Sequence, residues 1–129
     1  MPLKAVLTVS AVYLALLGVG FMFAPREIGI GAVPADASPA LVAYLRVFSG
    51  PVLGIAVLNW LARRAEPSTA LAAIVVANIV GFACVTAMDV WAVVSGAARQ
   101  PQKVFLVIHL LLTTGFVVAW RSRRDRRRA

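Results

Sequence analysis

Four long apolar runs, separated by short polar segments, dominate the chain. Residues 5–24 carry no charged side chain, residues 38–62 carry one, and residues 67–88 carry none. The fourth run covers residues 104–120. A helix needs about 20 predominantly apolar residues to cross the ~30 Å hydrocarbon core of a bilayer. The pattern therefore predicts four transmembrane helices, over about 4–24, 39–62, 68–95 and 102–121.

The segments between the runs predict where these helices begin and how they are arranged. Proline stands at the expected start of three spans, at Pro39, Pro67 and Pro101, and serine adjoins two of them, at Ser38 and Ser68. Proline is tolerated in a first turn because the N–H that it lacks has no partner there. Short connections make consecutive helices antiparallel neighbours. The predicted fold is all-α: an integral membrane, up-down four-helix bundle.

Composition supports this class and excludes others. Of the 129 residues, 61% are hydrophobic and 14% are charged, whereas about a quarter of the residues of a soluble domain are charged. A soluble domain of this size could not bury so much apolar surface. We therefore expect one membrane domain over residues 1–129, and no soluble enzyme, disordered chain or disulfide scaffold. The one cysteine, Cys84, is expected to be a small buried side chain.

Basic residues are unequally divided between the two sides of the predicted bundle. With four spans both termini share a side, and the opposite side holds only Arg26, Arg99 and Lys103. The positive-inside rule then predicts that both termini face the cytoplasm. The nine basic residues of the terminal side are Lys4, Arg63, Arg64, Arg121, Arg123, Arg124, Arg126, Arg127 and Arg128.

The basic tail over residues 121–129 has two interpretations. A run of arginines is typical of nucleic-acid binding, but no aromatic residue follows Trp120 to stack on bases, as single-strand binding normally requires. The tail is instead interpreted as a topology anchor that attracts anionic lipid headgroups. We expect the lipid bilayer, and no nucleic acid, as its partner.

Away from their ends, the predicted spans contain three residues of the Asp, Glu, His, Lys and Arg types: Arg46, Asp89 and His109. Such residues are costly in lipid and therefore mark candidate functional sites. A rise of 1.5 Å per residue places all three in the outer half, within about 9 Å of one another in depth. We expect an Arg46–Asp89 ion pair. The pair either fixes helix register or belongs to a polar pocket that opens to the outer face.

Two further polar residues share helix faces with these groups. Asn78 falls on the face of Asp89, and Thr113 on the face of His109, so we expect Asn78 and Thr113 to hydrogen-bond across helices. His109 is the only histidine, which excludes a multi-histidine metal site within one chain. Its alternatives are an imidazole hydrogen-bonded to Asp89 or a backbone carbonyl, a lone haem ligand, and a proton relay.

Small residues and a few short motifs indicate a family. Gly50 and Gly54 form a Gly-x-x-x-Gly pattern that permits close helix packing. Phe-Ala-Pro ends the first span, and the second span, with Arg46, Gly50 and Gly54, ends in Asn-Trp-Leu-Ala-Arg-Arg. With four short spans, this pattern resembles the DoxX-like superfamily of small membrane proteins. Arg46 followed by Asp89 in the next span is also similar to the sterol-synthesis scaffold family of the endoplasmic reticulum.

The resemblance implies an accessory role. Members of the wider group serve as membrane subunits beside quinone-linked oxidoreductases or as scaffolds for lipid-modifying enzymes. No phosphate loop, C-x-x-C, H-E-x-x-H or nucleophile elbow is present in the sequence, so no catalytic or metal-ligating residue is assigned. We expect an accessory or scaffold subunit whose partner is a second copy or another membrane protein.

A hydrophobic ligand, a quinone or a lipid, is the further expectation. Its head would be held at Arg46 and His109, and its tail would lie between Phe82, Phe105 and Phe116. A cavity that touches Arg46 and His109 favours this hypothesis, whereas a tightly packed pair without a cavity favours the scaffold. The alternative is a small transporter or proton-conducting protein that uses Arg46, Asp89 and His109. The candidate ligand-binding residues are Arg46, Asn78, Asp89, His109 and Thr113.

Overall fold

Four long helices and one short helix make up the described part of the chain. The computed structural model describes residues 3–29, 33–100 and 102–126, with side chains as far as Arg123. Each long helix is long and apolar enough to cross a membrane. The helices are α1 (Leu3–Phe23), α2 (Pro25–Ile28), α3 (Pro39–Ala62), α4 (Thr69–Val94) and α5 (Gln102–Arg126).

Local sequence signals account for the starts of α3 and α4. Ser38 and Ser68 are N-cap residues, and each side-chain oxygen accepts a hydrogen bond of 3.2 Å from a backbone N–H three residues later. These bonds satisfy N–H groups that the first turn of a helix leaves unpaired. Pro39 occupies the first turn of α3. Pro101, expected to mark the start of the last helix, lies outside the described residues.

The helix ends depart from the predicted spans at two places. The last helix continues past residue 121 to Arg126, while residues 127–129 of the basic tail lie outside the described residues. One turn of helix, α2, follows α1 directly, with Pro25 in its first turn and the Gly29 N–H bonded to the Pro25 carbonyl at 3.0 Å. The Phe-Ala-Pro sequence thus ends α1 by starting a second helix.

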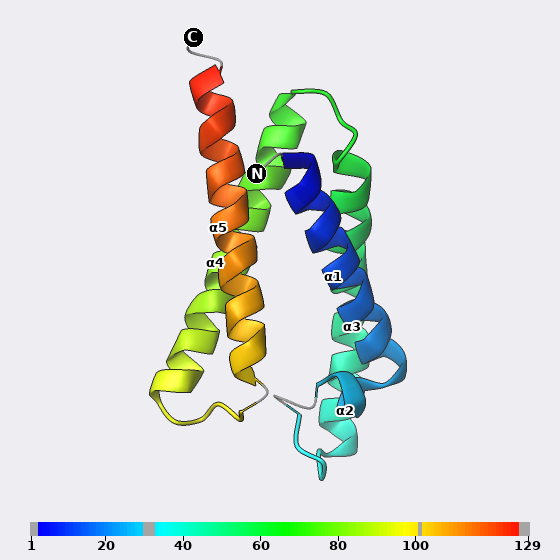
Figure 1. Cartoon of the computed structure of the whole chain (residues 1–129). Coiled ribbons are helices and arrows are strands. Elements are labelled where there is room, and N and C mark those ends of the chain that lie inside the picture. The colour runs from blue at the N-terminus through cyan, green and yellow to red at the C-terminus, as the bar shows by residue number, and fades with distance from the viewer. Residues whose placement is uncertain (1–2, 30–32, 101, 127–129) are drawn as a thin grey trace.

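The long helices are arranged as two pairs. α1 packs along α3, and α4 packs along α5. The two pairs contact each other less, through α1 against α5 and α3 against α4. Figure 1 shows both termini at the same end of the molecule, with the two pairs diverging toward the opposite end. The candidate site lies between these diverging pairs.

The apolar core fills only the half of the molecule next to the termini. It is built from the first part of α1 and α4 and the last part of α3 and α5. Phe116 is completely buried there and stacks on Phe82 with ring centroids 5.9 Å apart. The buried core residues are Val6, Leu7, Ala62, Leu71, Val75, Phe82, Leu112, Phe116 and Ala119.

Small residues of α1 and α3 differ in whether they contact a neighbouring helix. Gly50 and Gly54 are exposed, and a Cβ added at either would meet no atom within 4 Å. Neither glycine therefore makes a close helix contact within the described residues, and their packing against a partner helix stays a prediction. Gly18 makes the close approach instead, against Leu53 of α3. Cys84, expected to be buried, is exposed.

Candidate functional site

A cavity of about 410 Å³ lies between the two helix pairs, on the side of the core away from the termini. All four long helices contribute to its walls, and Ile28, Gly29 and Gln102 line it near the diverging ends. Most of the lining is apolar, as in Leu17 and Phe21 of α1. The polar residues that reach it are Tyr13, Asn78, Asp89, Gln102 and His109.

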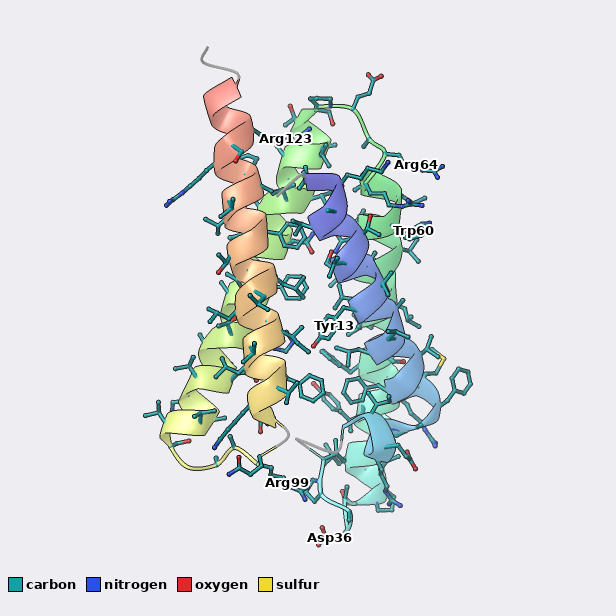
Figure 2. All side chains as sticks on the ribbon, viewed as in Figure 1. Tyr13, Asp36, Trp60, Arg64, Arg99 and Arg123 are labelled. Atoms are coloured by element: carbon teal, nitrogen blue, oxygen red, sulfur yellow. The ribbon has the colours of Figure 1, made fainter. Side chains whose placement is uncertain are left out.

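Three of these polar residues form one hydrogen-bonded chain across three helices. The Tyr13 hydroxyl lies 2.7 Å from His109 Nε2, and His109 Nδ1 lies 2.6 Å from Asp89 Oδ2. His109 and Asp89 are 9% and 8% exposed. In Figure 2 the Tyr13 side chain points from α1 into the space between the pairs, toward α5. The Tyr13–His109–Asp89 chain therefore joins α1 to α5 and α4.

Aromatic rings hold the imidazole in place. The His109 ring lies 6.2 Å from the Phe82 ring, 6.4 Å from the Phe105 ring and 5.7 Å from the Tyr13 ring, edge-on to the last. Phe82 and Phe105 also line the cavity, as expected from the sequence. Phe116, expected beside them, does not line it, because it is buried in the core behind Phe82. With both ring nitrogens bonded, the imidazole orientation is fixed.

A second polar cluster joins the helix pairs at the edge of the core. Asn59 and Asn78 exchange two amide hydrogen bonds of 2.8 Å, between α3 and α4. Asn59 also donates to the Ser10 hydroxyl of α1 at 3.1 Å, and Asn78 to the Ile74 carbonyl at 2.9 Å. Among the described residues, every buried side-chain nitrogen and oxygen has a partner. This cluster is therefore a satisfied structural contact.

The predicted ion pair between Arg46 and Asp89 is wrong. Asp89 bonds His109, and no carboxylate in the described ranges lies within salt-bridge distance of Arg46. Arg46 is exposed and lines a separate hollow with Arg26 and Glu27. α3 packs along α1 and contacts α4 less, so Arg46 and Asp89 do not face each other. The cavity at His109 does not reach Arg46, and the expectation of one cavity that touches both residues is therefore wrong.

The other predicted residues divide between the cavity and the helix interface. Asn78, Asp89 and His109 line the cavity, and His109 bonds Asp89, which was one of the alternatives considered for it. Thr113 does not line it: its hydroxyl donates to the His109 carbonyl at 2.8 Å and lies 3.2 Å from the Thr86 hydroxyl. The expectation that Asn78 and Thr113 hydrogen-bond across helices is confirmed, although they do not bond each other: Asn78 pairs with Asn59, and Thr113 with Thr86.

Sequence reasoning missed Tyr13, Asn59 and Ser10. Tyr13 lies near the middle of the 21-residue α1, although tyrosine in membrane proteins prefers the interface. A mid-span tyrosine was therefore a signal that its hydroxyl has a partner in the interior. Asn59, an uncharged polar residue inside an apolar run, likewise indicated a hydrogen-bond partner in the interior. Ser10 gave no such indication, because serine is common in membrane helices.

The site suits a molecule that is mostly apolar and carries a polar head. Its walls offer apolar surface, and its hydrogen-bonding capacity is concentrated in the Tyr13–His109–Asp89 chain. No group of three or more His, Cys, Asp or Glu residues in the described ranges is placed to hold a metal ion. Comparisons with protein-family models, curated proteins and solved structures give no match to this chain.

Proposed function

We propose that this protein is a small multi-pass membrane protein that holds a hydrophobic ligand, of the quinone or lipid class, between its two helix pairs. The observation that carries the proposal is the apolar cavity with the Tyr13–His109–Asp89 chain in its wall. Apolar walls with a few converging polar groups are the usual character of ligand pockets, whose volumes run from about 300 to 1,000 Å³. The cavity has this character at about 410 Å³.

The ligand enters from the side, between α3 and α4. Cavity residues of these two helices are also exposed: Ile55 by 44%, Leu58 by 43% and Val85 by 43%. Cavity residues of α1 and α5, including Tyr13 and Phe105, are half-buried or buried. A lateral opening faces the hydrocarbon of the bilayer, where an apolar ligand is dissolved. The polar chain then lies at the back of the cavity, opposite the entrance.

The proposal includes the membrane setting. The helices cross the bacterial inner membrane as an up-down bundle with both termini in the cytoplasm, as the nine-to-three division of basic residues favours. In Figure 2, Arg64 and Arg123 lie at the end that holds the termini, and Arg99 lies at the opposite end. The cavity then belongs to the outer half of the bilayer. Membership of the DoxX-like superfamily, with an accessory role, is part of this proposal.

Two glycines provide a matched test. Gly81 lines the cavity from α4, and Gly50 lies outside it on α3; a Cβ at either would meet nothing within 4 Å. Leucine is also a better helix former than glycine. Gly81→Leu fills the cavity, so we expect it to reduce co-purifying quinone or lipid at least about tenfold. Gly50→Leu should leave the amount unchanged, as measured by native mass spectrometry from mild detergent.

The same pair of variants separates this proposal from a scaffold without a ligand. A partner helix seated on Gly50 and Gly54 would be lost in Gly50→Leu and kept in Gly81→Leu, which is the reverse pattern. Ligand retention in both variants would contradict the cavity as the binding site. The transporter alternative requires Arg46 beside Asp89 and His109, and the position of Arg46 gives it no support.

A further inference from the structure

The hydrogen bonds of the polar chain define which head group the cavity accepts. We infer that the ligand carries a hydroxyl, as an apolar alcohol or phenol, and that this hydroxyl donates to Asp89 Oδ1. The inference rests on the proposed function and narrows its ligand, from the quinone or lipid class to a molecule of that class with a free hydroxyl. It follows from a count of the donors and acceptors that Tyr13, His109 and Asp89 leave unused.

Asp89 Oδ1 is the oxygen that remains free. The His109 bond uses Oδ2, and Oδ1 has no hydrogen-bond partner among the described residues. Since every buried side-chain oxygen in the described residues has a partner, Oδ1 is not sealed inside the protein. Asp89 lines the cavity, and we therefore assign Oδ1 to the space that the proposed ligand would occupy. A carboxylate oxygen in an apolar site is costly without a donor.

Apart from Asp89 Oδ1, the Tyr13–His109–Asp89 chain offers the cavity a hydrogen-bond acceptor and no free donor while Asp89 is ionised. A neutral imidazole has one N–H and one acceptor nitrogen. With Asp89 ionised, His109 Nδ1–H donates to Asp89, and the Tyr13 hydroxyl donates to Nε2. Tyr13 Oη then keeps only its lone pairs. In this arrangement both ends of the chain, Asp89 Oδ1 and Tyr13 Oη, accept hydrogen bonds, and the ligand must supply the proton.

One additional proton reverses the direction of the hydrogen bond to the ligand but leaves the class of ligand unchanged. The proton either sits on Asp89 Oδ1 or passes through His109 and frees the Tyr13 O–H to point into the cavity. A hydroxyl both donates and accepts, so it fits the chain with or without that proton. A carbonyl or an ether only accepts and fits one arrangement. The other walls provide no competing charge, since the cavity residues of α2 and α3 are not ionisable.

The test compares two probes of nearly equal size, 4-nonylphenol and its methyl ether. Dissociation constants are measured on the full-length protein in detergent by equilibrium dialysis. Because a hydrogen bond to a charged group contributes about 1.5–3 kcal/mol, we expect the phenol to bind about 10- to 100-fold more tightly than the ether. Asp89→Asn should abolish this preference, since an amide can turn a donor toward the ligand. Arg46→Gln, outside the cavity, should preserve it.

The outcomes distinguish the inference from the function on which it rests. If both probes bind equally, the hydroxyl inference is overturned while the cavity remains a ligand site. If neither binds, both the inference and the proposed function fail. If Asp89→Asn does not fold, the ratio between the two probes on the unaltered protein decides alone. If Arg46→Gln loses the preference for the phenol, the head group binds in the hollow lined by Arg46, and the assignment to Asp89 is overturned.

Discussion

At the scale of single residues, the partner of Asp89 illustrates how buried charge is placed in this protein. The His109 imidazole bonds the Asp89 carboxylate through Nδ1 and the Tyr13 hydroxyl through Nε2, so that both ring nitrogens have partners. A guanidinium has five N–H groups to satisfy, and few acceptors line the apolar cavity. Arg46 instead remains exposed at the surface, where its long stem lets the charge reach water or headgroups.

This placement predicts opposite effects for two substitutions. Arg46→Ala should change the free energy of unfolding by less than about 1 kcal/mol, because exposed charges contribute little. His109→Leu should cost roughly 3–5 kcal/mol, because it leaves the Asp89 carboxylate buried without its partner. Reversible unfolding in mixed detergent micelles measures both values. If Arg46→Ala greatly reduced the free energy of unfolding and His109→Leu reduced it little, Asp89 would be paired with Arg46 rather than with His109.

At the scale of helices, close packing depends on which glycine faces a neighbour. A Cβ on Gly18 would lie 2.6 Å from Leu53 Cγ and 3.3 Å from the Leu53 backbone nitrogen. α1 and α3 therefore approach each other at Gly18. The Gly-x-x-x-Gly pattern of α3 faces away from every described helix.

Replacing Gly18 and Gly50 by alanine should therefore change the free energy of unfolding in opposite directions. Gly18→Ala forces α1 and α3 apart and should destabilise the protein by about 1–3 kcal/mol through overpacking. Gly50→Ala meets no atom and should stabilise α3 by up to about 1 kcal/mol, because alanine is the better helix former. The same unfolding titration compares the two variants. Equal effects would show that Gly18 is not a packing contact.

At the scale of the whole molecule, one half is packed and the other is hollow. The core lies beside the termini, and the cavity lies where the helix pairs diverge. A contact between the loops spans the diverging ends: the Arg99 guanidinium, after α4, donates to the Val33 carbonyl, before α3, at 3.1 Å. This bond limits how far the pairs separate. Because of this asymmetry, the orientation in the membrane would decide which leaflet supplies the proposed ligand.

The orientation is tested with reporter fusions. A reporter after Ala129 should read cytoplasmic, and one inserted within residues 26–37 should read external, because most Lys and Arg residues lie on the side of the termini. An alkaline phosphatase and green fluorescent protein pair at each position provides the internal control. The reverse pattern would place the cavity in the inner leaflet.

The sequence by itself determined the elements of this protein. Uninterrupted apolar runs marked the four long helices, and Ser38 and Ser68 marked the starts of two of them, because hydropathy and capping act within a few residues of the chain. The cost of charge in lipid marked Asp89 and His109 as candidate interior residues, but it marked Arg46 equally and did not decide which of the three faces inward. The hydrogen bond between Asp89 and His109 could be predicted as one alternative, because it depends only on the faces of two helices.

Only the tertiary structure decided how the helices are rotated about their axes and which of them pack together. In a soluble protein the apolar face of a helix identifies the core, whereas in a membrane the faces toward lipid and toward protein are both apolar. Nothing local therefore showed that Arg46 and Gly50 face outward, or that Tyr13 reaches across to His109. The cavity arises because two well-packed pairs diverge, and this property belongs to the assembled helices rather than to any one segment.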